Sequence, residues 1–172
     1  LPDDAQAAEL LARAKALGIY LLDTAAAYGS SEERLGHLLQ GQRQEWVICT
    51  KVGEEFINGQ SYFNFTPTYV RESVVRSLQR LNTDYLDVVL VHSSGDDVGI
   101  IQRYGVLEVL NELKQQGLIR ATGMSTKTVE GGLLAASQSD VVMATYHPGY
   151  TLETPVLDYC RDHHKAVFVK KA

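Results

Sequence analysis

Short apolar runs alternate with longer amphipathic stretches along the whole chain. The apolar runs have the length of strands and are not interrupted by polar positions, which is typical of strands buried on both faces. They predict strands over 19–22, 46–49, 85–91, 119–124, 141–144 and 166–169. Because helical stretches separate these runs, the pattern predicts a parallel sheet, in either a doubly wound fold or a (β/α)8 barrel. No Gly-x-Gly-x-x-Gly turn follows the first strand, which argues against a dinucleotide-binding doubly wound domain.

The stretches between the strands carry helix signals. Asp3-Asp4 is suited to cap the first helix, and Thr66-Pro67 supplies a cap and a first helical residue for another. The predicted helices cover 5–17, a stretch that begins after Ser30 or Ser31, a stretch from Thr66 to Leu81, a stretch around 106–113 that ends at Gly117, and 129–137 and 152–163. The segments 53–65 and 93–101 are predicted as loops after the second and third strands.

Composition narrows the class of protein. The 172 residues are 45% hydrophobic and 22% charged, with a net charge of −5, as expected of a single globular domain over residues 1–172. No basic stripe stands out, so we expect no nucleic-acid partner. The apolar runs are too short to cross a bilayer, so we expect no membrane partner. Cys49 and Cys160 occur in unrelated contexts and are predicted to be buried thiols, which fits a cytoplasmic protein.

Polar residues follow three consecutive predicted strands. Asp23, Lys51 and His92 each come directly after an apolar run. Right-handed crossovers would place these strands side by side, so a carboxylate, an ammonium and an imidazole would meet at the carboxyl ends of the strands, where barrel enzymes have their active sites. Taken singly, each residue has a structural explanation, as a cap, a solvated charge or a hydrogen-bonded histidine. Together they indicate either a catalytic cluster or a structural ion-pair network.

Several segments resemble those of the aldo-keto reductase family, and they occur in the family's order. They are residues 23–32, 48–51, 81–92, 117–120, 123–125 and 146–148. The resemblance covers nearly the whole chain. It implies a TIM barrel and NAD(P)H-dependent interconversion of small-molecule carbonyls and alcohols. In the family's barrel an N-terminal hairpin and first strand precede these segments, and an eighth strand follows them, so we expect the expressed protein to be longer than these 172 residues.

The resemblance also implies roles for individual residues. Tyr28 would be the general acid, Lys51 would favour its phenolate form, Asp23 would pair with Lys51, and His92 would orient the substrate carbonyl. The cofactor would be NADPH, with NADH as the alternative. Its expected contacts are Asp23, Ser125, Thr126, Met143, Lys170 and Lys171. Three aromatic residues of the 53–65 segment either line the substrate pocket or pack the loop against the barrel: Tyr62, Phe63 and Phe65.

Two positions depart from the family's pattern. Met143 occupies a position where many members have a glutamine that bonds the nicotinamide carboxamide. Lys171, or Lys170 if the alignment is shifted by one, lies near the position where many members stack a tyrosine on the nicotinamide ring. We therefore expect weaker anchoring of the nicotinamide. The leading function is a carbonyl reductase or an alcohol or sugar dehydrogenase; the alternatives are a non-catalytic nucleotide-binding regulatory member and an inactive fragment.

Overall fold

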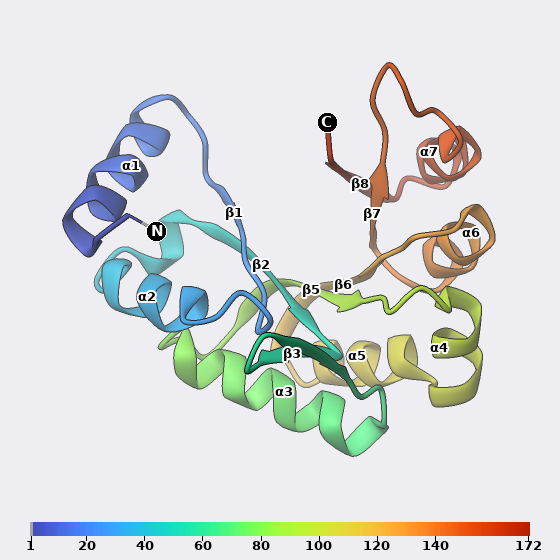
Figure 1. Ribbon diagram of the computed structural model, residues 1–172, viewed down its shortest axis with the longest axis horizontal. Helices are drawn as coiled ribbons and strands as arrows, with labels where there is room; N and C mark the ends of the chain where they lie inside the picture. The colour runs from blue at the N-terminus through green and yellow to red at the C-terminus, as the bar shows by residue number, and fades with distance from the viewer. Residues whose placement is uncertain (1) are drawn as a thin grey trace.

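The computed structural model describes residues 2–172, in which six parallel strands form one curved sheet (Figure 1). The order along the sheet is β1-β2-β5-β6-β7-β8, so strands that follow one another in this series are also neighbours in space. The strands are β1 (Leu21–Asp23), β2 (Val47–Val52), β5 (Leu86–His92), β6 (Ile119–Ser125), β7 (Val141–Thr145) and β8 (Ala166–Lys170). The six predicted strands and the predicted side-by-side order are confirmed.

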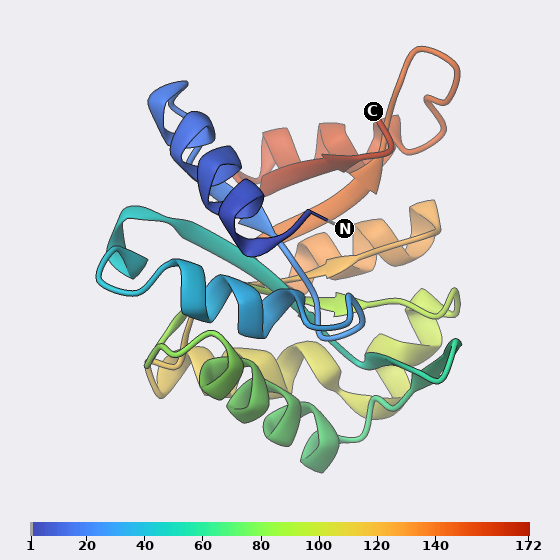
Figure 2. The same cartoon turned by 60° about the vertical axis from the view of Figure 1, so that its left-hand side comes forward.

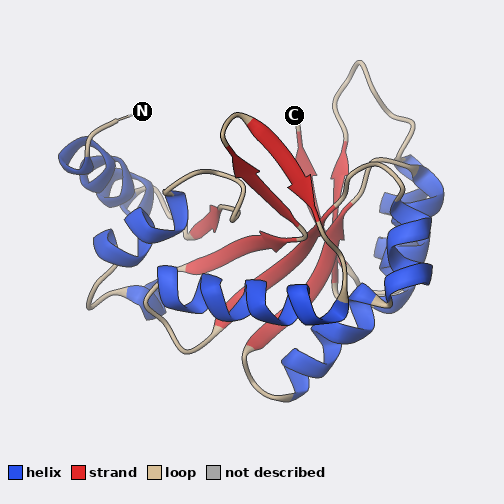
Figure 3. Cartoon of the chain, turned by 60° about the horizontal axis from the view of Figure 1, so that its bottom comes forward, coloured by secondary structure: helices blue, strands red, loops and turns tan. Residues whose placement is uncertain are grey.

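The first helix precedes the first strand and the other helices come after strands, and the helices lie on the outer side of the sheet (Figures 1 and 3). They are α1 (Asp4–Ala16), α2 (Ser31–Leu38), the 3-10 helix η1 (Arg43–Glu45), α3 (Pro67–Arg80), α4 (Asp97–Tyr104), α5 (Val106–Gln115), α6 (Val129–Gln138) and α7 (Thr154–Asp162). The predicted cap of α1 is confirmed, because the Asp3 carboxylate accepts from the backbone N–H of Gln6 at 2.8 Å. Pro67 is the first residue of α3, as expected.

The segment 53–65 was expected to be a loop, and this expectation was wrong. It contains an antiparallel hairpin of β3 (Glu54–Ile57) and β4 (Gln60–Phe63). Asn58 and Gly59 join the strands with φ values of 52° and 81°, which is the backbone of the tight turn that Asn-Gly favours. The local signal was therefore present in the sequence. Figure 2 shows the hairpin projecting beyond the end of β2.

The segment 93–101 was also expected to be a loop, whereas its second half begins helix α4. The Asp96 carboxylate accepts from the backbone N–H of Gly99 and starts the helix. Gly105, with a φ of 59°, ends it and separates it from α5. Helix α4 is short and α5 begins one residue after it, so the apolar positions of the two helices run together in the sequence.

Alternate residues of the strands serve two different apolar clusters. One set packs beneath the helices and forms the main core. The other set, on the helix-free concave face, forms a smaller cluster of Cys49, Val88, Leu90, Val141 and Met143. The strands therefore read as unbroken apolar runs because both faces are covered. Cys49 and Cys160 are buried free thiols, as predicted.

The sheet is curved but open within residues 2–172. β1 and β8 are its two edge strands, and they lie at opposite ends of the curve (Figure 1). The six strands thus form part of a barrel wall, which agrees with the expected TIM barrel without its first and eighth strands. Among the described residues, no helix is long and apolar enough to span a membrane.

Candidate active site

A cavity of about 620 Å³ lies at the carboxyl ends of the strands, within the size range of small-molecule sites. Its lining consists of Asp23, Tyr28, Lys51, His92, Ser125, Thr126, Lys127, Met143, Thr145, His147, Tyr150, Glu153, Lys170 and Lys171. All the residues predicted for catalysis and for cofactor contact are in this set. The structure therefore brings together side chains that the sequence spreads from the first strand to the end of the described chain.

The register of the strands explains how three of these residues converge. Asp23 pairs with Cys49, two residues before Lys51, and Lys51 pairs with Leu90, two residues before His92. The three side chains therefore lie at successive heights along the strands. Each step of two residues keeps the side chain on the same face of the sheet. The stagger results from the tilt of the strands relative to the barrel axis. Because of it, the three side chains lie in a row along the concave face.

Lys51 is the buried charge of the site. Its side chain is 1% exposed, and its Nζ donates to Asp23 Oδ1 at 2.7 Å and to the Thr24 carbonyl at 2.9 Å. A buried ammonium is costly unless it is paired and hydrogen-bonded, and here it is both. The same Nζ lies 4.8 Å from the centroid of the Tyr28 ring. The ammonium is thus fixed beside the phenol.

Tyr28 lies in the connection between β1 and α2. Its backbone N–H donates to the Ala25 carbonyl at 3.0 Å, and this turn presents the ring at the cavity. The Tyr28 ring is edge-on to the His92 ring, with centroids 6.2 Å apart and an interplanar angle of 87°. The residue is 46% exposed. Tyr28 is therefore an accessible member of the cavity lining.

His92 ends β5 and has a partner that the sequence did not reveal. Its Nδ1 lies 2.7 Å from Oε2 of Glu54, at the start of the hairpin. Burial lowers the pKa of His92, and the charges of Lys51, Lys170 and Lys127 lower it further, whereas Glu54 opposes them. The imidazole is therefore largely neutral at pH 7.

On the opposite side of the cavity, Lys170 at the end of β8 connects this strand to the end of β6, two strands away in the sheet. Its Nζ donates to Ser125 Oγ at 3.0 Å and to the Thr126 carbonyl at 2.6 Å. Burial lowers the pKa of Lys170, although Glu153 opposes this effect. Met143 is 6% exposed and presents an apolar surface to the cavity floor. Of the two C-terminal lysines, Lys170 is thus the one fixed against the Ser125-Thr126 segment.

Glu153 is a further cavity residue that sequence reasoning missed. It precedes α7 and looked like an ordinary helix-start residue. It is 1% exposed, and its Oε2 has no hydrogen-bond partner within residues 2–172. The Thr126 hydroxyl, also in the lining, is another buried polar group without a partner there. Buried polar groups are normally satisfied, so these two atoms are candidates to hydrogen-bond a molecule in the cavity.

The three aromatic residues considered for the substrate pocket do not line this cavity. Phe65 is 6% exposed and packs between Phe63 and Tyr104, with ring centroids 6.1 Å from each. Tyr62 and Phe63 are exposed on the hairpin. Phe65 therefore packs the hairpin down, which was one of the two alternatives that the sequence left open.

Known proteins share both the sequence and the fold. The sequence profile of the Aldo/keto reductase family matches residues 2–169. Aldo-keto reductase YhdN of Bacillus subtilis is 33% identical over 170 residues, which cover 94% of this chain and 50% of that protein. The NADH-specific methylglyoxal reductase of Escherichia coli is 33% identical over 162 residues, 85% of this chain and 50% of that protein.

A solved structure of an aldo-keto reductase from Pseudomonas aeruginosa superposes with a TM-score of 0.97 at 54% identity, covering 98% of this chain and 67% of that one. The chain spans about half the length of these two curated relatives. The family match extends over nearly all of it, and the fold and the sequence agree on the same relatives. The chain therefore belongs to the aldo/keto reductase family.

Proposed function

We propose that the protein containing this chain is an NAD(P)H-dependent reductase of small-molecule carbonyls, which also oxidises the corresponding alcohols. The observation that carries the proposal is the buried Lys51 ammonium, held by Asp23 and placed 4.8 Å from the centroid of the Tyr28 ring inside a cavity. A structural ion pair alone would not need an accessible phenol beside the charge. The family's fold supports extending the six strands to a (β/α)8 barrel, and the two free thiols fit a reducing, cytoplasmic setting.

The cavity fits a nicotinamide group. The unpartnered Thr126 hydroxyl and Glu153 carboxylate are placed to hydrogen-bond an amide or a ribose hydroxyl, and Ser125 adds a third polar group. Met143 offers an apolar surface against which a ring can rest. Lys170 and Lys171 add positive charge near the same wall. The dinucleotide would supply the hydride, and the chain would hold and orient it.

Each residue of the cluster then has a distinct task. Hydride delivery to a carbonyl leaves negative charge on its oxygen, which a proton or a fixed positive field must meet. Tyr28 donates that proton, and the adjacent Lys51 ammonium stabilises the phenolate that remains. Asp23 and the Thr24 carbonyl keep Lys51 in place. His92 borders the same space and orients the reacting oxygen.

NADPH is the cofactor that we propose to be preferred. The Escherichia coli relative is named NADH-specific, so the two nucleotides need a direct comparison. The test is fluorescence titration of the full-length protein with NADPH and with NADH, followed by single-turnover oxidation of each with nitrobenzaldehyde. We expect binding and turnover, with tighter binding of NADPH. Binding without turnover would instead identify a regulatory nucleotide-binding member, and absence of both would contradict the proposal.

A further inference from the structure

We infer that Glu32 is a positioning residue that fixes the distance between Tyr28 and Lys51 from the outer side of the sheet. It acts through a hydrogen bond from the hydroxyl of Thr50. The inference rests on the proposed function, in which the tyrosine donates the proton and the lysine stabilises the phenolate. Neither Glu32 nor Thr50 lines the cavity. They belong instead to α2 and β2, the elements beside which the tyrosine and on which the lysine lie.

Glu32 is a charged residue in the layer between the sheet and the helices. It is 0% exposed, and its Oε1 accepts from Thr50 Oγ1 at 2.6 Å. Its Oε2 accepts from Nη1 of Arg80, the last residue of α3, at 3.3 Å. Both oxygens of the carboxylate thus have a donor, as a buried charge requires. Replacing a buried ion pair by apolar residues is often neutral or stabilising, so stability alone does not account for a carboxylate here.

The strand β2 connects the two faces of the sheet at this point, because successive side chains of a strand point to opposite faces. Thr50 faces the helices, where it reaches Glu32. Lys51 faces the cavity, where its Nζ donates to Asp23. The two neighbouring residues share one planar peptide unit. A rotation of the strand at Thr50 therefore also moves the base of the lysine side chain.

The start of α2 extends the same constraint to Tyr28. The backbone N–H of Ser31, the first residue of α2, donates to the Tyr28 carbonyl at 3.2 Å. Ser31 Oγ also accepts from Thr24 Oγ1 at 2.8 Å, and the Thr24 carbonyl accepts from Lys51. Glu32 is the next residue of the helix. Two separate contacts thus join the start of α2 to the lysine and its strand, and two attachment points fix an orientation that one would leave free to rotate.

Helix α2 is itself held closely against α3, which lies beside it on the outer side of the sheet (Figure 2). Gly36 lies one turn after Glu32, on the same face of the helix. A Cβ at Gly36 would lie 2.2 Å from the carbonyl oxygen of Arg80, so the two helices touch there through their backbones. The side chain of the same arginine is the second donor to Glu32. The carboxylate is therefore fixed where α2, α3 and β2 meet.

Thr50→Val tests the inference, because valine keeps the shape of the side chain and removes only the hydroxyl. In the full-length protein, single-turnover reduction of nitrobenzaldehyde by NADPH should slow by roughly tenfold, since misplacing a reacting group by about 1 Å can cost about 10²-fold. NADPH affinity in fluorescence titration should stay unchanged, because Ser125 and Thr126 lie on another strand end. Thr50→Ser keeps the hydroxyl and should restore the rate. A merely structural role would lower the unfolding midpoint and leave the rate of the folded protein unchanged.

Glu32→Met is the second variant, because it keeps the length of the side chain and removes the acceptor. It should slow turnover to the same extent, and the double variant with Thr50→Val should be little worse than the poorer single one. Glu33→Gln is the matched control. Glu33 is the adjacent residue of α2 and also pairs with Arg80, at 3.2 Å, but it is exposed. Its replacement should leave the rate unchanged.

A crystal structure of Thr50→Val tests the geometry without any turnover. The separation of Lys51 Nζ from the Tyr28 ring centroid, 4.8 Å here, should change by more than about 0.5 Å, the precision to which such sites are held. An unchanged separation would overturn the inference, and so would a wild-type rate in Thr50→Val or an equal loss in Glu33→Gln. Absence of turnover in the wild type would count against the proposed function alone, and the variant's structure would still decide the role of Glu32.

Discussion

Lys51 Nζ lies 4.8 Å from the centroid of the Tyr28 ring, although the lysine is 1% exposed and the tyrosine 46%. The charge is thus buried while the ring above it remains accessible. Desolvation strengthens the field of an ammonium, because little water screens it. The pair therefore combines a fixed positive field with a proton donor that a ligand can touch, which is the arrangement that stabilisation of a developing oxyanion requires.

Replacing Tyr28 by phenylalanine tests the proton donor. The change keeps the ring and its edge-on contact with His92 and removes only the hydroxyl. We expect folding and NADPH binding to survive and carbonyl reduction to fall by roughly 10²–10⁴-fold, the usual scale for loss of a general acid. Single-turnover NADPH oxidation measures the rate, and circular dichroism checks the fold. A wild-type rate in a folded, NADPH-binding variant would make the cluster a structural network.

Replacing Lys51 by methionine tests the buried charge. The length of the side chain is kept, but Asp23 and the Thr24 carbonyl lose their donor. Activity should fall because nothing then stabilises the phenolate. Lys15→Met is the control, since Lys15 forms a surface pair with Glu45. Because the lysine and the tyrosine act as a unit, the double variant with Tyr28→Phe should be little worse than the poorer single one. Losses that multiply would show that they act independently.

Replacing Met143 by glutamine tests the anchoring of the nicotinamide. Met143 lines the cavity and cannot donate a hydrogen bond, whereas glutamine can both donate and accept. We expect tighter NADPH binding in fluorescence titration, by roughly tenfold, which corresponds to about 1.4 kcal/mol. Met143→Leu is the matched control, because it keeps an apolar side chain, and it should bind NADPH like the wild type. Unchanged or weaker binding by the glutamine variant would contradict this explanation.

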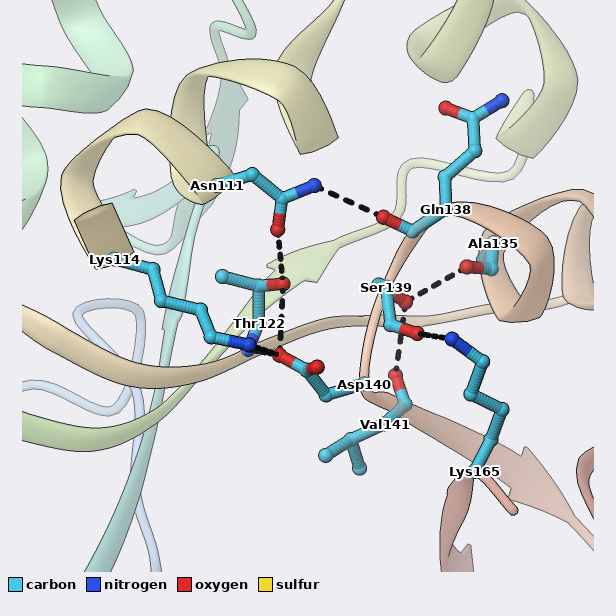
Figure 4. Close-up of polar contacts among 9 residues, drawn as sticks. All are labelled: Asn111, Lys114, Thr122, Ala135, Gln138, Ser139, Asp140, Val141 and Lys165. Atoms are coloured by element: carbon cyan, nitrogen blue, oxygen red, sulfur yellow. Dashed lines mark hydrogen bonds and ion pairs between the residues drawn. The ribbon is translucent and has the colours of Figure 1, made fainter. Parts of the chain in front are cut away.

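Asp140 gives the fold a pH-dependent contribution outside the site. Its Oδ2 accepts from Lys114 Nζ at 2.6 Å and from the Thr122 backbone N–H at 2.9 Å, and Asn111 bonds the Thr122 hydroxyl (Figure 4). Burial alone would raise the pKa of Asp140, but the bonds from Lys114 and Thr122 outweigh it and lower that pKa. A lowered pKa in the folded state means that the contribution is present above the unfolded value, about 3.9, and is lost as the pH falls through the folded value.

Asp140→Asn should therefore lower the free energy of unfolding at pH 7 by about 0.5–1 kcal/mol, a small effect because the pair is partly exposed. The difference from the wild type should narrow below about pH 4. Urea unfolding of the full-length wild type and variant, at pH 7 and below about pH 4, measures the difference in free energy of unfolding at each pH. Asp158→Asn, which removes an exposed partner of Arg161, should change stability little. A difference that stays constant with pH would show that the charge of Asp140 is not responsible.

The sequence by itself determined the alternation of strands and helices and the residues at the strand ends. Apolar runs, the Asp3 cap and Pro67 act over a few residues, so they can be read without the rest of the fold. The order of motifs likewise placed Asp23, Lys51 and His92 on neighbouring strands. The hairpin turn at Asn58-Gly59 was also encoded locally, but it was merged into a loop.

Tertiary structure decided the rest. The two-residue stagger that brings Lys51 and His92 to one face depends on how the strands tilt, and no single strand records that tilt. Phe65 turns inward because Gly53 leaves room for its ring. Glu54 reaches His92 only through that packing, and Glu153 is buried in the cavity only because α7 follows β7 there. Such contacts join residues far apart in the chain, so their geometry arises when the core packs and not from local preference.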